Sequence, residues 1–117
     1  MSELIRLHAE PLYVVHFIGF APGFGYLDGL PRELATPRLP SPRVRVPVGS
    51  VGIAGDQTGI YATPAAGGWR LIGRTPLVMF DARREQPSLL TAGDRVRFRP
   101  ISLAEFRTQA RGLRDDA

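Results

Sequence analysis

The chain has 117 residues, enough for one compact domain with a single hydrophobic core. Its 44% hydrophobic and 22% charged content is typical of a globular protein, and the absence of cysteine excludes disulfides, thiolate nucleophiles and Cys-ligated metals. The net charge is +4, and all 15 basic residues are arginine, so neither a Schiff base nor a phosphate-loop lysine is available.

Several function classes are disfavoured by what the sequence lacks. No apolar run approaches the ~20 residues of a membrane helix, and the first residues do not resemble a secretory signal. We therefore expect a cytoplasmic protein without membrane contact. His8 and His16 are not spaced as metal ligands, so we expect no metal site. The alternating arginines of residues 95–99 lack interleaved aromatics on the same face, so we expect no nucleic-acid surface.

In chain order, the pattern predicts a helix, many short strands and a second helix. Residues 2–10 have apolar side chains at helical spacing, and we interpret them as the last turns of a helix that begins before this chain. Residues 21–42 are dominated by turns, and a stretch of this length is usually functional. Ser102 and Glu105 form a capping-box pattern that opens a helix to about Arg111, closed by Gly112. Strands are predicted over residues 12–20, 43–48, 50–54, 58–63, 69–73, 77–80 and 95–101.

This order predicts a mainly β fold, a closed antiparallel β-barrel with short flanking helices. Residues 1–11 would be the remnant of a helix that links to an absent N-terminal domain. Residues 12–101 would form the barrel, and residues 102–117 the C-terminal helix and tail.

Three segments have side chains suited to a functional site, beginning with the aromatic run of residues 19–27. Its glycines introduce turns, so its rings cannot all pack inward. Phe20 and Phe24 are equally well explained as staples of a loop to the core. Tyr26 is the better site candidate, because a buried phenol needs a polar partner.

The second segment, residues 47–61, has closely spaced glycines whose N–H groups could hold an oxyanion. Tight turns at a barrel corner are the competing explanation. Asp56, Gln57 and Thr58 favour a site, since a strand pair needs no carboxylate, amide and hydroxyl there.

The third segment contains Trp69, for which core packing is the simplest role, and then Arg74 and Thr75. A guanidinium and a hydroxyl at a strand end suit recognition of a substrate carboxylate. A surface ion pair between Arg74 and Asp81 or Glu85 is the alternative.

Together, the segments resemble one known family. The motifs occur in a fixed order at residues 19–27, 36–38, 49–61, 67–69, 73–76 and 92–96. They resemble the B subunit of 5-oxoprolinase, also called allophanate hydrolase subunit 1 and the Kip-type kinase inhibitor, a carboxyltransferase protein of the subdomain C and D type. The resemblance covers residues 3–101 and implies a cyclophilin-like barrel, the C-terminal domain of a two-domain chain.

The resemblance implies a hydrolase that is active only as part of a complex. With a homologous C subunit and a third subunit, such proteins convert 5-oxoproline, ATP and water to glutamate, ADP and phosphate. ATP would be bound by the assembled complex and is not localised to this domain. We expect Gln57 and Tyr61 to orient a small amide or carboxylate substrate, and Arg74 to bind its carboxylate. Around them, the residues expected to line the substrate site or the interface with the partner are Tyr26, Arg38, Gly52, Gly55 and Thr75.

Other functions remain open at this point. The chain could be a protein-binding module that inhibits a sensor histidine kinase, with Phe24 and Tyr26 as an exposed contact. Allophanate or urea-carboxylase-like amide chemistry is a further alternative. Prolyl isomerase activity is suggested by the fold alone, which is a weak guide to function.

Overall fold

The computed structural model describes residues 2–19, 23–63 and 65–110, which form a mainly antiparallel β domain with two short α-helices. The helices are α1 (Glu3–Ala9) and α2 (Leu103–Gln109), with a 3-10 turn η1 (Arg32–Leu34) between β2 and β3. The strands are β1 (Tyr13–Ile18), β2 (Gly25–Asp28), β3 (Arg43–Val46), β4 (Ser50–Ala54), β5 (Gln57–Ile60), β6 (Ala65–Gly67), β7 (Arg70–Arg74) and β8 (Arg95–Val96).

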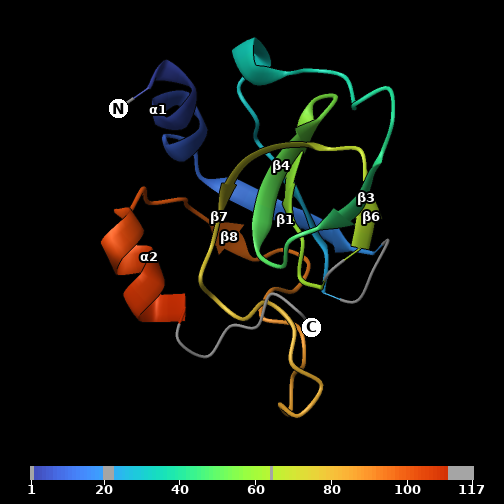
Figure 1. The fold of residues 1–117 in the computed structure, drawn as a ribbon, viewed down its shortest axis with the longest axis vertical. Helices are drawn as coiled ribbons and strands as arrows, with labels where there is room; N and C mark the ends of the chain where they lie inside the picture. The colour runs from blue at the N-terminus through green and yellow to red at the C-terminus, as the bar shows by residue number, and fades with distance from the viewer. Residues whose placement is uncertain (1, 20–22, 64, 111–117) are drawn as a thin grey trace.

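The strands form one large sheet and one small ribbon, and every pair is antiparallel. The order in the six-stranded sheet is β7-β4-β5-β2-β1-β8, and β3 pairs with β6 in the two-stranded β3–β6 ribbon. Figure 1 shows both helices on one side of the molecule and the ribbon on the opposite side. This confirms the predicted mainly β antiparallel class. Because β7 and β8 are the edges of the sheet order, closure into a cyclophilin-like barrel stays a prediction.

Two strand predictions need correction, and two strands were not predicted. The strand predicted over residues 77–80 is wrong, since only Phe80 makes an isolated bridge, to Ser88. The strand predicted over residues 95–101 shortens to β8. Conversely, β2 and β6 lie in stretches expected to be turns, although β2 pairs with both β1 and β5 in the middle of the sheet. Their Gly-rich composition hides them, because glycine is normally depleted in strands.

Both helices begin at a capping serine. The Ser2 side chain accepts a hydrogen bond from the Ile5 N–H at 3.3 Å. At α2 the predicted capping box is confirmed: Ser102 Oγ accepts from the Glu105 N–H, and Glu105 Oε1 accepts from the Ser102 N–H. The helix ends at Gln109, and the expected closure at Gly112 lies outside the described residues.

The two faces of the sheet have separate cores. Side chains alternate along β5, so Thr58 and Ile60 face one way while Gln57 and Tyr61 face the other. We name the first the helix face; its buried side chains are Tyr13, Val15, Leu27, Val51, Ile60, Ala62 and Met79. We name the second the aromatic face; its buried side chains are Phe24, Val46, Ala54, Tyr61 and Trp69.

A buried histidine fastens α1 to the helix face. The exposed fraction of His8 is 4%, and its Nε2 lies 2.9 Å from Thr58 Oγ1. The Thr58 hydroxyl donates to the Gly52 carbonyl at 2.8 Å, so Thr58 accepts from a neutral His8 protonated on Nε2. Tyr13 adds a hydrogen bond from its hydroxyl to the His8 carbonyl at 2.6 Å. The N-terminal helix is thus held to the sheet by a polar contact of a histidine whose burial disfavours the charged form.

Replacing His8 by glutamine should remove a pH dependence of stability. Burial lowers the pKa of His8 to about 4, so at mildly acid pH the unfolded chain binds a proton that the folded chain does not. The free energy of unfolding should therefore fall between about pH 6.5 and pH 4, by up to about 3 kcal/mol. Glutamine keeps an N–H donor for Thr58 without titrating, so H8Q should show a flatter profile of denaturant midpoint against pH.

His16 provides the matched control for this measurement. Its side chain is 57% exposed, and its Nδ1 lies 2.7 Å from Asp28 Oδ2. In a His16→Asn background, the difference between the profiles with and without the H8Q substitution should persist. If the denaturant midpoint changes with pH equally with and without the imidazole at position 8, His8 is not the group that causes the pH dependence.

Candidate functional site

Two paired glycines on the aromatic face leave room for the rings that pack against the sheet. Gly52 on β4 pairs with Gly59 on β5. A Cβ on Gly52 would lie 3.1 Å from the Trp69 Cβ, and one on Gly59 would lie 2.9 Å from the Phe24 ring. Both distances are too short for an unstrained side chain, so these glycines are needed to let rings approach the sheet. Phe24 is 1% exposed and Trp69 is 7% exposed, which confirms both as core residues.

The Tyr61 hydroxyl lies between this sheet and the β3–β6 ribbon. Tyr61 is 1% exposed, and its ring meets Phe24 edge-on at 5.0 Å between centroids. A Cβ at Gly67 in β6 would overlap the phenol oxygen and lie 2.9 Å from Cζ. Only glycine at position 67 therefore allows the ribbon to settle over the phenol. The side chain of Tyr61 is enclosed, not presented outward as the sequence suggested.

Two arginines lie near this hydroxyl. Arg43 in β3 is the register partner of Gly67, the residue that covers the phenol oxygen. A Cβ on the adjacent Gly68 would lie 3.8 Å from the Arg38 Cβ. Burial raises the pKa of Tyr61, while a backbone hydrogen bond from Trp69 and the positive charges of Arg38 and Arg43 act in the opposite direction. A neutral phenol with two exposed guanidinium side chains around it is a suitable place for a small carboxylate.

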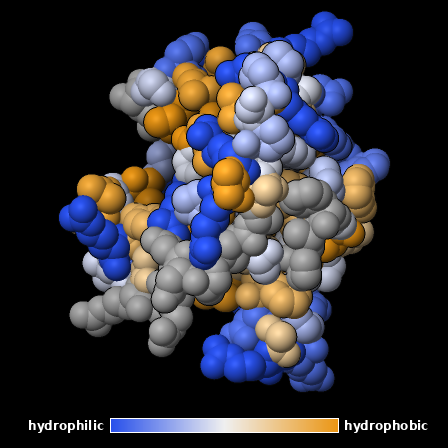
Figure 2. Space-filling model, turned by 45° about the vertical axis from the view of Figure 1, so that its right-hand side comes forward, coloured by the Kyte–Doolittle hydropathy of each residue, from blue (hydrophilic) through white to orange (hydrophobic). Residues whose placement is uncertain are grey.

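Tyr26 and Gln57 lie on the same face as the phenol. Tyr26 pairs with Gly59 in the sheet, and its ring lies 5.8 Å from the Trp69 ring and 4.3 Å from that of Phe17, on which it stacks. Gln57 is partly exposed and begins β5, four residues before Tyr61, which directly follows that strand, about 13 Å away along the backbone. The aromatic face therefore carries Tyr26, Arg38, Gln57 and Tyr61, with Tyr26 near enough to affect the pKa of Tyr61 and Gln57 farther away along the backbone. Figure 2, which turns the ribbon side toward the viewer, shows hydrophilic and apolar residues interleaved there.

The expectation that glycine amides hold an oxyanion is not supported by the geometry. The Gly55 N–H donates to the Thr36 carbonyl at 2.6 Å, and the Gly49 N–H donates to the Tyr61 carbonyl at 2.7 Å. Gly52 is buried in a strand paired on both sides. The turn explanation fits better, since Gly55 has a φ of 60° at the end of the β4–β5 hairpin.

Arg74 and Thr75 are not part of this face. Arg74 pairs with Ser50 at the end of β7, its Nε donates to the Val48 carbonyl at 2.8 Å, and its guanidinium lies 5.5 Å from the Phe106 ring centre in α2. The Thr75 N–H donates to the Gly49 carbonyl at 2.8 Å. Both residues line a cavity on the helix face. The structure therefore splits the predicted site in two, with Arg74 and Thr75 separated from Tyr61 by the sheet.

The aromatic surface predicted to contact a sensor histidine kinase is only partly exposed. Phe24 is enclosed in the aromatic core, so its expected role as an exposed contact is wrong. Phe17, which is 43% exposed, is the ring that accompanies Tyr26 at the surface. Phe20 lies outside the described residues.

Sequence reasoning missed Arg43 and Gly67. The alternation of residues 43–46 indicated only a solvated strand face, and Gly67 was one of several turn-forming glycines. Arg43 and Gly67 become part of the candidate site only through the pairing of β3 with β6, which the local sequence does not encode. One sequence signal for Arg43 was available. The pair Pro42-Arg43 repeats the earlier pair Pro37-Arg38, in which an arginine also follows a conformationally rigid proline.

The described ranges carry neither a metal-ligand cluster nor a membrane-spanning helix. No group of three or more His, Cys, Asp or Glu side chains in them could hold a metal ion. Neither helix of this part of the chain is long and apolar enough to cross a membrane.

These features define a small antiparallel β domain with a ribbon-covered aromatic face bordered by arginines. Residues 1–90 match the family described as carboxyltransferase domain, subdomain C and D, and the chain belongs to that family. It is similar to the B subunit of 5-oxoprolinase from Haemophilus influenzae, with 56% identity over 97 residues, 83% of this chain and 46% of that protein. It is also similar to the B subunit of 5-oxoprolinase from Bacillus subtilis, with 50% identity over 105 residues, 90% of this chain and 44% of that protein.

A solved structure has the same fold. The crystal structure of a conserved uncharacterized protein from Pyrococcus horikoshii matches with a TM-score of 0.86 and 54% identity, over 89% of this chain and 48% of that chain. The present chain thus spans about half the length of the curated relatives that it matches.

Replacing Gly67 by alanine should destabilise the ribbon. The added Cβ overlaps the enclosed Tyr61 hydroxyl, and overpacking of this kind costs about 1–3 kcal/mol. The free energy of unfolding should fall by this amount, and the near-ultraviolet dichroism of the packed rings should weaken. Gly73→Ala is the matched control, because a Cβ at this exposed position meets nothing within 4 Å. Equal stability of the two variants would refute the packing role of Gly67.

Proposed function

We propose that this chain acts as the C-terminal part of a 5-oxoprolinase B subunit, and that its aromatic face supplies the binding site for the substrate carboxylate. In the assembled complex, a homologous C subunit and a third subunit would complete the hydrolysis of 5-oxoproline to glutamate with cleavage of ATP. The observation that carries the proposal is the pair Arg38 and Arg43 beside the Tyr61 phenol, in a chain at least 50% identical to proteins named as the B subunit of 5-oxoprolinase.

The proposed chemistry of this face is recognition and orientation. Arg38 and Arg43 are exposed, so they can reach a carboxylate that approaches the ribbon, and two guanidinium groups fix its position better than one. Tyr61 is neutral at pH 7, since burial raises a pKa that is ordinarily near 10, so it does not compete with the anion by charge. The partly exposed Gln57 amide would meet the amide end of the substrate or the neighbouring subunit.

ATP cleavage is assigned in this proposal to the assembled complex. The chain has no lysine with which to build a phosphate loop. Its glycine amides at positions 49 and 55 already donate to backbone carbonyls, so they are poor phosphate ligands. The domain would then present the substrate, and the partner subunits would provide the ATP site. The accompanying fold proposal is a cyclophilin-like barrel, supported by the six-stranded antiparallel order.

A second candidate function is inhibition of a sensor histidine kinase. It is favoured by one observation, the stacked rings of Phe17 and Tyr26, of which Phe17 is 43% exposed. Capture of a kinase dimerisation domain by the chain would support it, and capture of a homologous C subunit would support the hydrolase.

Removing either guanidinium should lower activity in the complex. Arg38→Gln and Arg43→Gln should each reduce kcat/KM for 5-oxoproline by about tenfold to a hundredfold, the usual effect of losing a hydrogen bond to a charged group. Because a carboxylate contact acts on ground-state binding too, much of the loss should appear in KM. The measurement is steady-state kinetics of the reconstituted complex.

Arg95→Gln is the control for charge alone. Arg95 is exposed on β8, at an edge of the sheet two strands from the β2–β5 pair. Its removal should leave kcat/KM within about twofold of wild type, with complex assembly unchanged in all variants. Wild-type kinetics in both R38Q and R43Q would overturn the proposed carboxylate site.

A further inference from the structure

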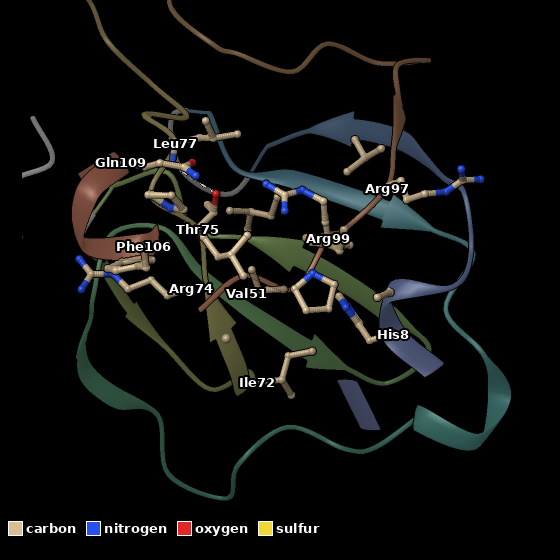
Figure 3. A pocket seen from close by; sticks show the side chains of 18 of the residues that line it. His8, Val51, Ile72, Arg74, Thr75, Leu77, Arg97, Arg99, Phe106 and Gln109 are labelled. Carbon is tan, nitrogen blue, oxygen red and sulfur yellow. Dashed lines mark hydrogen bonds between the residues drawn. The ribbon is translucent and has the colours of Figure 1, made fainter. Parts of the chain in front are cut away.

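A large cavity opens on the helix face, away from the proposed carboxylate site. Its volume is about 720 Å³, within the range of pockets that hold drug-sized ligands. Its floor comes from the sheet, including Val51, Ile60 and Ile72, and Phe106 of α2 lies at one side. It is lined by residues of both β7 and β8, the two edge strands of the sheet. In Figure 3, Val51 lies near the centre of the view, Ile72 lies beneath it, and Phe106 lies beside Arg74 at the left.

The lining combines apolar side chains with positive charge. Of the described residues around the cavity, none is acidic, while Arg74, Arg97 and Arg99 all contribute. His8, at the far wall, is uncharged at neutral pH because burial lowers its pKa to about 4. An apolar cavity wall favours an apolar guest over water, and an arginine at the mouth favours an anion.

Arg99 is the arginine best placed to meet such an anion. Its side chain is 71% exposed, and its nearest acidic partner, Glu105, lies at 4.0 Å, the limit of an ion pair. In Figure 3, Arg99 extends over the mouth of the cavity, whereas Arg97 points away from it. Arg74 is already bonded to the Val48 carbonyl and lies over the Phe106 ring. The Thr75 hydroxyl accepts from the Leu77 N–H at 3.2 Å, which leaves its proton available to a ligand at the rim.

We propose that this cavity binds an amphipathic carboxylate, a small acid with a medium-length apolar body. The apolar part lies against Ile72 and Val51, and the carboxylate lies at Arg99. This ligand site is separate from the one proposed at Arg38 and Arg43, because the sheet lies between them. The proposal for this cavity is therefore independent of the proposed oxoprolinase function.

The test is calorimetric titration of the 117-residue chain with decanoate, compared with decanol. Decanoate should bind saturably and at least about tenfold more tightly than the neutral alcohol, the effect of one charge-assisted hydrogen bond. Arg99→Gln should remove this preference, while Arg97→Gln should change decanoate affinity by less than about twofold. Both positions are exposed, so neither variant should disturb folding.

Methyl NMR of the same titration locates the ligand. Shifts should concentrate on the Ile72 and Val51 methyls, and Ile72→Trp, which fills the cavity, should abolish them. Absence of saturable decanoate binding would overturn the proposal. Equal affinity for decanol, or equal effects of the two arginine variants, would overturn it as well. So would shifts confined to Gly67 and Gly68 in backbone-amide spectra recorded during the same titration.

Discussion

The arrangement of the aromatic face depends on one contact, the enclosure of the Tyr61 hydroxyl beneath Gly67. A phenol enclosed between a sheet and a ribbon needs a polar partner, which the Trp69 backbone supplies. The contact also requires the ribbon to approach within van der Waals distance, which a side chain at position 67 would prevent. Once the ribbon is in place, its pairing sets Arg43 opposite Gly67, and Arg38 in the loop before β3 lies beside Gly68. The candidate site is thus a consequence of packing.

The sheet divides two sets of functional candidates that the sequence places close together. Tyr61 and Arg74 are separated by only 13 positions. Tyr61 directly follows β5, Arg74 ends β7, and both strands pair with β4. Side-chain alternation nevertheless sends Tyr61 to the aromatic face and Arg74 to the helix face. On the helix face, Arg74 joins β7 to α2 through the Phe106 ring, and His8 joins α1 to β5. The helices are therefore held on one side by the polar contacts of His8 and the cation–π contact of Arg74, and the arginine pair lies on the other.

Much of the fold could be predicted from local patterns. The α2 capping box, the β4–β5 hairpin around Gly55 and the strand at Arg70–Arg74 each have a short-range signal. The site was harder to predict, because its members are joined by pairings distant in sequence. Arg43 and Gly67 meet through a register that no local pattern specifies, and β2 is a strand only because β1 and β5 pair with it. Glycines at positions 52 and 59 have the pattern of flexible turns, yet their function is to admit rings.

The most direct test of the carboxylate site is an NMR titration with 5-oxoproline of the chain bound to its partner subunit, observing backbone amides and arginine Nε groups. The account predicts shifts at Arg38, Arg43 and the amides of Gly67 and Gly68, with Arg74 and Thr75 unchanged. Shifts at Arg74 and Thr75, with the ribbon unaffected, would contradict it.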